Sequence, residues 1–217
     1  MPRRFRYNET CMHTTTHQPV RSAGFSLVEL LVTTAIICIL SVMMFGFSSA
    51  RRQRTQMELC RDNLQKLYIA IQIYAKDSHD QLPPAGDATT SEPVLGILVP
   101  KYSADTSLFI CPGGRDAALP SGAPLSDGKI SYAYYTGRHL DDPAAAQQVL
   151  LSDRQVNTAA KLPGEPVFST TGKSPGNNHY KYGGNFLFAD GTAQAAPPLA
   201  AIPLPLPSGV TLLNPKP

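Results

Sequence analysis

A long apolar run lies near the start of the chain. Residues 25–47 are apolar apart from Glu29 and a few hydroxyl side chains. As a helix, this run would be about 35 Å long, which is enough to cross a bilayer. The chain after Arg51 mixes polar and apolar residues, so the pattern predicts at most one membrane crossing.

A helical pattern continues beyond this run. Apolar positions recur at intervals of three and four residues, which is the spacing of one helix face; they are Met57, Cys60, Leu64, Leu67, Ile71 and Tyr74. No proline occurs between Phe25 and Pro83. We therefore expect one long helix over about residues 25–77, with an amphipathic part within residues 48–82 that packs on a globular head.

The chain from Pro83 onward changes to short β-prone segments separated by turn residues. The pattern predicts a short helix or turn at 92–98. It predicts strands at 107–110, 130–135, 149–152, 185–189 and 192–195. Asp190-Gly191 predicts a type I′ hairpin between the last two. These features indicate an α+β fold, in which the long helix packs on a small antiparallel sheet formed within residues 83–196.

The C-terminal segment, residues 197–217, contains seven prolines and no acidic side chain. Such a composition favours extended backbone with few contacts. We expect a loosely packed tail there.

Composition and charge narrow the function. Charged residues make up only 16% of the chain, which also has 20 prolines, 16 glycines and no tryptophan. This profile argues against a helical bundle or a coiled coil. The net charge of +3 arises entirely within residues 1–24, and the rest of the chain has 15 basic and 15 acidic residues. Nucleic-acid binding requires a concentrated basic surface, so we expect no nucleic-acid partner.

Three explanations of the apolar run compete. A secretory signal peptide would have a shorter apolar core, although Ser48-Ser49-Ala50 weakly resembles its cleavage site. A simple membrane anchor fits the length but leaves Glu29 unexplained, unless that side chain reaches the interface. A carboxylate in lipid costs a few kcal/mol, so a charged partner is expected.

The third explanation supplies that partner. Gly24-Phe25-Ser26-Leu27-Val28-Glu29 resembles the N-terminal signal of type IV pilins and type II secretion pseudopilins. The resemblance implies that prepilin peptidase removes a basic leader, residues 1–24, by cutting between Gly24 and Phe25, and then N-methylates Phe25. Cleavage would create a positive amine one helical turn from Glu29. The carboxylate could then pair with the amine of a neighbouring subunit and set the stagger between subunits.

The distribution of basic residues favours the opposite orientation to this signal. Lys and Arg are more frequent after the apolar run than before it, which would place the C-terminal side in the cytoplasm. The leader signal is more specific, and the peptidase acts on a cytoplasmic leader. We therefore expect a single pass through a bacterial inner membrane, with the head in the periplasm or cell envelope.

The head has a second resemblance. The segments around Cys60, Phe109-Ile110-Cys111-Pro112, Ser131-Tyr132-Ala133-Tyr134 and His179 to Gly191 are similar to pseudopilin-like proteins of planctomycete and verrucomicrobial bacteria. Those proteins end in a His-spacer-Asp-Gly motif, here His179, Asp190 and Gly191. Ten residues separate the histidine from the aspartate, one more than in the family pattern. The resemblance implies a structural rather than a catalytic role for the motif.

The four cysteines suggest one crosslink. Cys11 would leave with the leader, and Cys38 lies in the membrane segment. Cys60 and Cys111 remain, and in an oxidising compartment they would form a disulfide that joins the helix to the head. The alternative is two unpaired thiols, with Cys60 buried on the apolar helix face.

Other chemistry has weaker signals. The candidate calcium ligands do not have clustered spacing; they are Asp141, Asp142, Asp153 and Asp190. The histidines have no zinc spacing; they are His79, His139 and His179. Nucleophile-elbow, phosphate-loop and dinucleotide motifs do not occur. We expect no metal, no cofactor and no enzymatic activity. The aromatic residues of 131–135 and 180–182 could form a contact surface or pack within strands.

These observations predict a structural subunit that is processed by prepilin peptidase. It would assemble with other pilin or pseudopilin subunits, through its N-terminal helix, into a type II secretion pseudopilus or a type IV pilus. The alternative is a single-span, membrane-anchored extracytoplasmic binding domain that never polymerises and that recognises carbohydrate or another envelope protein.

Overall fold

The computed structural model describes residues 24–46 and 48–217. The chain divides into two compact units, residues 1–46 and 47–217, and each is described by itself. Helix α1, Leu27–Gly46, lies in the first unit, and helix α2, Ser48–Asp77, lies in the second. Residues 1–23 of the predicted leader lie outside the described residues. So does residue 47, so the prediction of one unbroken helix over 25–77 stays a prediction.

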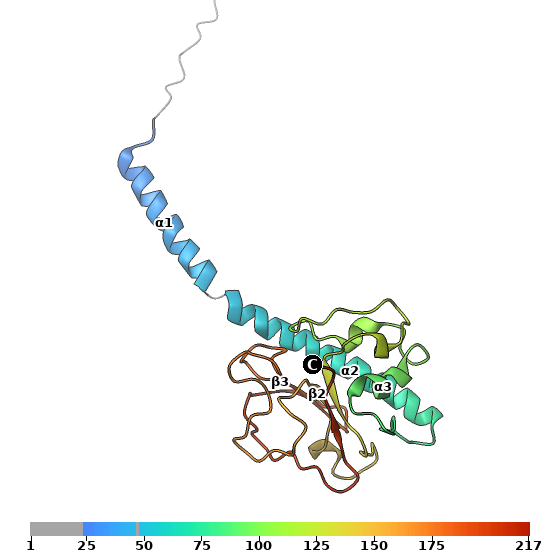
Figure 1. Ribbon diagram of the computed structural model, residues 1–217. Coiled ribbons are helices and arrows are strands. Elements are labelled where there is room, and N and C mark those ends of the chain that lie inside the picture. Colours follow the sequence, from blue (N-terminus) through green and yellow to red (C-terminus); the bar gives the residue numbers. More distant parts are fainter. Residues whose placement is uncertain (1–23, 47) are drawn as a thin grey trace, which may run out of the picture. The chain divides into compact units, whose positions relative to one another are not determined.

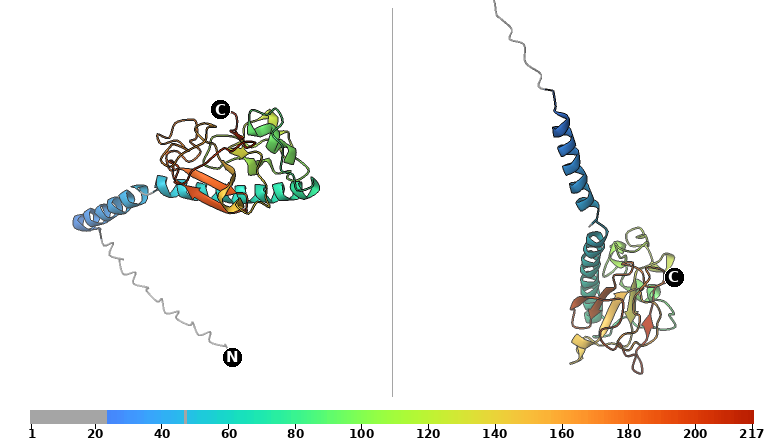
Figure 2. Two further views of the ribbon diagram at one scale, coloured as in Figure 1. Left: turned by 90° about the horizontal axis from the view of Figure 1, so that it is seen from below. Right: turned by 90° about the vertical axis from the view of Figure 1, so that its left-hand side faces the viewer.

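Helix α2 confirms the apolar stripe read from the sequence. Cys60, Leu64, Leu67 and Ile71 are fully buried, and Met57 and Tyr74 at the ends of the stripe are partly buried. Figure 2 shows α2 running along the strands of the head. The helix ends at Asp77, where two residues with positive φ, His79 and Asp80, reverse the chain.

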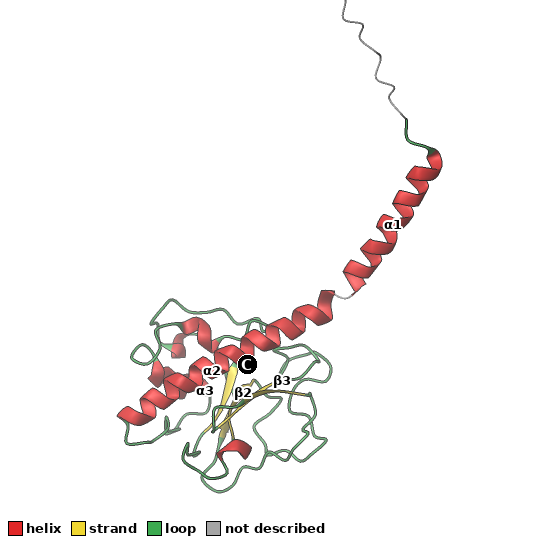
Figure 3. Ribbon diagram, turned by 180° about the vertical axis from the view of Figure 1, so that it is seen from behind, coloured by secondary structure: helices red, strands yellow, loops and turns green. Residues whose placement is uncertain are grey.

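The second layer is a five-stranded antiparallel sheet with the order β4-β3-β2-β1-β5. Figure 3 shows these short strands among extensive loops. The α+β fold is therefore confirmed, and β1 to β4 match four of the predicted strands. The strands are β1 Tyr132–Tyr135, β2 Val149–Asp153, β3 Gly184–Phe188, β4 Ala193–Ala196 and β5 Leu212–Leu213.

Both faces of the sheet are buried except at the edge strand β4, whose residues are half-buried or exposed. Alternate side chains of β1 point to opposite faces, as strand geometry requires: Tyr132 and Tyr134 join the core beneath α2, whereas Ala133 and Tyr135 join a second cluster. The second cluster also contains Val167 and Phe168 from the segment between β2 and β3, and Leu204 from the C-terminal segment. The tyrosines of β1 are at most 1% exposed, so the idea that residues 131–135 form a contact surface is wrong.

Short helices lie in the connections between α2 and β1 and between β1 and β2. The helix predicted at 92–98 is confirmed as α3, Ser91–Leu95, followed by a 3-10 helix at Gly96–Leu98 (Figure 1). Further 3-10 helices span Leu125–Asp127 and Ala145–Gln147.

The strand predicted at 107–110 is wrong, because Thr106–Phe109 forms a 3-10 helix. Its N-terminal residue, Asp105, accepts hydrogen bonds at Oδ1 from the backbone N–H of Ser107 at 3.0 Å and from the Ser107 hydroxyl at 2.6 Å. A capping carboxylate of this kind favours a helical turn over an extended strand. The turn places Phe109 in the core with no exposed surface.

The prediction of a loosely packed C-terminal tail is also wrong. Leu204, Leu212 and Leu213 are at most 5% exposed, and β5 pairs with β1 at the edge of the sheet. The side chain of Asn214 accepts from the N–H of Gln155 at 3.1 Å and donates to its carbonyl at 3.0 Å. The tail is therefore an integral layer of the head, even though its prolines keep most of it out of regular structure.

The hairpin between β3 and β4 is confirmed, but its turn is not type I′. Gly191 has a φ of +88°, whereas Asp190 is not among the described residues with positive φ. The turn is closed by Gly191 N–H donating to Phe188 O at 2.9 Å, so the glycine follows the two central residues instead of being one of them. A Cβ on Gly191 would lie 2.6 Å from the ring of Tyr68 on α2, so this close approach also requires glycine.

Candidate processing segment and buried polar cluster

The predicted cleavage site lies just before α1. Gly24 and Phe25 are exposed and precede the helix, whose first backbone hydrogen bond runs from Leu30 N–H to Ser26 O at 3.0 Å. No described atom lies within 4 Å of the position a Cβ would take on Gly24. The Gly24–Phe25 bond is thus in irregular, accessible backbone, which is the form in which a peptidase can bind it.

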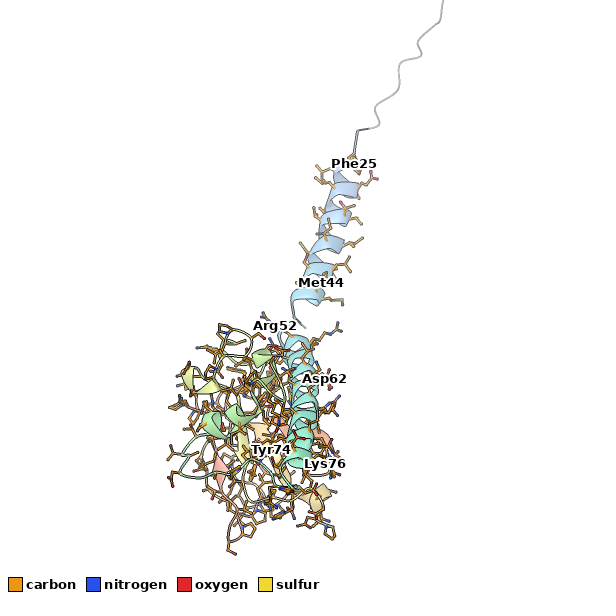
Figure 4. The ribbon with its side chains drawn as sticks, turned by 90° about the vertical axis from the view of Figure 1, so that its right-hand side faces the viewer. Phe25, Met44, Arg52, Asp62, Tyr74 and Lys76 are labelled. Carbon is orange, nitrogen blue, oxygen red and sulfur yellow. The ribbon has the colours of Figure 1, made fainter. Side chains whose placement is uncertain are left out.

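Helix α1 presents an apolar surface that its own unit does not cover. The segment Leu27–Met44 has a mean hydropathy of 2.4, and none of it is buried within the structure. Figure 4 shows its side chains projecting on all sides between the labelled Phe25 and Met44. By length and composition this helix can cross a membrane.

The polar groups of α1 fall into two kinds. The hydroxyls of Thr33, Thr34 and Ser41 donate to backbone carbonyls of the preceding turn at 2.7–2.9 Å, which satisfies them without water. Glu29 lies in the first turn and has no ion-pair partner in the described part of the chain. The helix dipole favours a carboxylate at this end but does not neutralise its charge. Glu29 is therefore the polar group of α1 that still requires a partner.

The sequence comparison bears directly on this segment. The family model of the prokaryotic N-terminal methylation motif matches residues 20–45. The match contains Gly24, Phe25 and Glu29. Together with the apolar helix and the small sheet, it supports a membrane-anchored, pilin-like substrate of prepilin peptidase. Comparison with curated proteins and with solved structures gave no match. The resemblance of the head to planctomycete and verrucomicrobial proteins stays a prediction.

The head contains a buried cluster of metal-ligating side chains. One potential ligand atom from each lies within 4.8 Å of each of the others, and every residue is at most 1% exposed. The four come from α2, from the turn after the 3-10 helix Thr106–Phe109, from the end of β2 and from the loop before β3; they are Cys60, Cys111, Asp153 and His179. We refer to them as the Cys-His-Asp cluster.

Direct contacts join the members of the Cys-His-Asp cluster. The Cys60 thiol donates to Asp153 Oδ1 at 3.1 Å. His179 Nε2 lies 3.2 Å from Cys111 Sγ and 3.3 Å from Asp153 Oδ2. The other ring nitrogen, Nδ1, is buried without a hydrogen-bond partner and faces Gly113, where a Cβ would come within 2.6 Å of it. The imidazole therefore directs Nε2 into the cluster.

A ring of donors surrounds the cluster. Asn178 donates to Asp153 Oδ1 at 2.9 Å. Asn185 donates to Oδ2 through its backbone N–H at 2.7 Å and through its side chain at 3.1 Å. The Tyr132 hydroxyl lies 3.2 Å from Cys60 Sγ. These neighbours fix the orientation of the carboxylate and of one sulfur, and they favour negative charge on both.

The electrostatics of the cluster follow from burial and from the His179–Asp153 pair. Burial lowers the pKa of His179, but the Asp153 carboxylate outweighs this and raises it to about 10. Burial raises the pKa of Asp153, but the imidazole and its hydrogen bonds bring it below the usual value. Burial raises the pKa of the Cys60 thiol well above its usual value. For Cys111, hydrogen bonds from Cys60 and His179 outweigh burial and lower the pKa.

The structure separates the residues of the predicted His-spacer-Asp-Gly motif. His179 belongs to the cluster before β3, whereas Asp190 and Gly191 form the turn after β3. The Asp190 carboxylate accepts from the N–H and hydroxyl of Thr192 at 2.8 and 2.9 Å. All three residues thus have structural positions, at opposite ends of one strand.

The structure brings only some of the other predicted ligands together. Cys60 and Cys111 are brought together, as a disulfide would require, but both are free thiols in this structure, so the disulfide stays a prediction. Among the residues suggested for calcium, Asp153 joins the cluster, whereas the exposed Asp141 and the hydrogen-bonded Asp142 do not.

Sequence spacing could not reveal the cluster. Members that follow one another along the chain are 26 to 51 positions apart, and His179 gives no local ligand pattern with any of the others. The sequence places one cysteine on the apolar face of a helix and a second in the head. That signal identified Cys60 and Cys111 but gave no reason to add Asp153.

Proposed function

We propose that the chain is a structural pilin-like or pseudopilin subunit. Prepilin peptidase cleaves it after Gly24 and methylates the new amine of Phe25, and α1 then assembles it with other subunits. The product is a type II secretion pseudopilus or a type IV pilus, with the head in the periplasm or cell envelope and α1 crossing the inner membrane before assembly. The match of the methylation motif at residues 20–45 carries the proposal.

The physical reason for assembly is the surface of α1. This helix is apolar on every side and is not covered by its own fold, so lipid or neighbouring helices must cover it. The Glu29 carboxylate makes this helix less favourable in lipid alone: such a charge costs about 2.5–3.5 kcal/mol at the bilayer centre, and less near the helix end where Glu29 lies. Pairing Glu29 with the Phe25 amine of a neighbour removes two charges from lipid together and fixes the axial offset between subunits.

We also propose that the chain is not itself an enzyme. The Cys-His-Asp cluster contains residue types used in catalysis, but its side chains are at most 1% exposed and a substrate would have no access to them. Its role in the proposal is to stabilise the head.

The mass of the purified chain tests the processing step. The full-length protein is expressed in a bacterium that has prepilin peptidase, extracted from membranes and measured by intact-mass spectrometry. We expect a chain that begins at Phe25 and has one additional methyl group. The Gly24→Arg variant should keep its leader, because the arginine side chain prevents the Gly24–Phe25 bond from entering the active site of the peptidase. A wild-type chain that retains residues 1–24 would refute processing and favour the anchored binding domain that never polymerises.

A further inference from the structure

We propose that the Cys-His-Asp cluster is a structural zinc site with the ligands Cys60, Cys111, Asp153 and His179. The proposal concerns the head alone and does not depend on cleavage or filament assembly.

The donor atoms match the chemistry of zinc. Two sulfurs, one imidazole nitrogen and one carboxylate oxygen are ligands that Zn²⁺ accepts in tetrahedral sites, whereas calcium and magnesium require oxygen ligands throughout. Four protein ligands leave no open coordination position, and the cluster is closed to solvent. Both features are typical of structural rather than catalytic zinc.

The distances match as well. Zinc–ligand bonds of about 2.0–2.3 Å place tetrahedral ligand atoms about 3.2–3.8 Å apart. The contacts of Cys60 Sγ with Asp153 Oδ1, of Cys111 Sγ with His179 Nε2 and of His179 Nε2 with Asp153 Oδ2 are 3.1, 3.2 and 3.3 Å, close to the lower end of this range. One ligand atom from each residue lies within 4.8 Å of those of the other three. An ion at their centre would therefore need only small side-chain adjustments.

Hydrogen bonds alone do not account well for the contacts of the His179 imidazole. His179 Nε2 faces both Cys111 Sγ and Asp153 Oδ2, and a single N–H can point well at only one of two acceptors. Four ligand atoms within 4.8 Å of one another are explained more simply by an ion that all of them coordinate. In that case His179 Nε2 coordinates the metal through its lone pair, and the sulfur and the oxygen coordinate the same ion.

The residues around the cluster also suit a zinc ion. Two thiolates and one carboxylate bring three negative charges, and Zn²⁺ leaves a net charge of −1. Asn178 and Asn185 donate to Asp153, and the Tyr132 hydroxyl is within hydrogen-bond distance of Cys60 Sγ. Donors that orient anionic ligands and spread their charge are what zinc sites have outside their first coordination shell.

The proposed ion would join α2 to the sheet. It would link Cys60 in the middle of α2 to the end of β2, and both to the loops that hold Cys111 and His179. Zinc and the predicted disulfide exclude each other, because both use the same two sulfurs. Zinc binding would stabilise the folded head, since the unfolded chain does not hold these ligands together.

Metal analysis of the full chain tests the proposal. The protein is purified in detergent with a reductant, incubated with Zn²⁺, dialysed and analysed for metal content. We expect one zinc per chain in the wild type and almost none in Cys60→Ser or His179→Ala. The controls are Cys38→Ser and His139→Ala, which remove exposed residues of the same types and should keep one zinc per chain.

Loss of a buried ligand can unfold the head, so two further measurements use folded protein. Co²⁺ in place of zinc should give the thiolate charge-transfer absorption and visible bands of four-coordinate cobalt in the wild type. Tyr132→Phe keeps the ring and all four ligands but removes a hydroxyl beside Cys60 Sγ; it should weaken zinc binding about 10- to 100-fold. Folded, reduced wild-type protein that binds no zinc would overturn the proposal. So would a Cys60–Cys111 disulfide in protein isolated directly from the cell envelope.

Discussion

Replacing Leu213 by alanine tests whether the C-terminal segment is part of the core. Leu213 is 4% exposed and packs in the cluster beneath α2, while its neighbour Leu212 points to the opposite face of the sheet. If the tail were loose, as its seven prolines suggest, this side chain would contribute little. The structure instead makes β5 the edge strand that closes both cores.

The magnitude follows from burial. Leucine-to-alanine changes in cores cost about 2–5 kcal/mol, of which the smaller values apply where neighbours can fill the space. Because β5 is a short edge strand whose surroundings can relax, we expect a loss of about 2–4 kcal/mol from the free energy of unfolding. For a unit of this size, about 3 °C per kcal/mol gives a decrease of about 6–12 °C in Tm.

Near-ultraviolet circular dichroism of the tyrosines is a suitable assay for the detergent-solubilised chain. Helix α1 contains no tyrosine, so the signal reports unfolding of the head without interference from that helix. Leu162→Ala is the matched control, because Leu162 is 67% exposed, and it should change Tm by less than about 2 °C. Equal, small shifts for both variants would refute the packing of the tail against the sheet.

Three further predictions concern charge. Glu29→Ala should leave processing intact and prevent filament assembly, while Glu58→Ala, which removes an exposed carboxylate from α2, should not; normal filaments of the first variant would contradict the pairing mechanism. Asp116→Ala removes the carboxylate that pairs with the largely buried Arg154 at 3.0 Å and leaves the guanidinium only neutral acceptors such as the Ile130 carbonyl. Denaturant unfolding should show a loss of about 3–5 kcal/mol, and a loss below about 1 kcal/mol would contradict the prediction. Burial raises the pKa of Tyr135 to about 12, so the unfolded chain loses this proton first, and stability should fall between about pH 10 and 12 by about 1.4 kcal/mol per pH unit. Tyrosine absorbance during alkaline titration measures this, and ionisation without unfolding would count against it; burial adds the same effect for Tyr132 and Tyr134.

Local sequence was sufficient for the processing segment and for most regular elements. The signal at Gly24, Phe25 and Glu29 is contiguous, so its residue order alone carries the information. The stripe from Cys60 to Ile71 is a periodic pattern several residues long, and periodicity reflects which face is buried. The end of α2 was likewise predictable, because prolines follow it closely.

Elements whose conformation depends on distant contacts were not predictable in this way. A strand as short as β5 contains no periodic pattern, and only its hydrogen bonds to β1 define it. The segment 107–110 has the composition of a strand, yet the Asp105 cap and the burial of Phe109 make it helical. The prolines of the tail restrict its backbone but do not prevent its leucines from filling the core.

Contiguous residues are enough to define the cleavage and methylation signal, the apolar helix and the amphipathic helix that follows. The Cys-His-Asp cluster, and the second core that the tail completes, arise only in the folded chain. The reason is the length of chain between the interacting groups. Neighbouring residues impose their geometry on one another directly, whereas Cys60 and His179 meet only because every intervening strand and turn brings them to the same point.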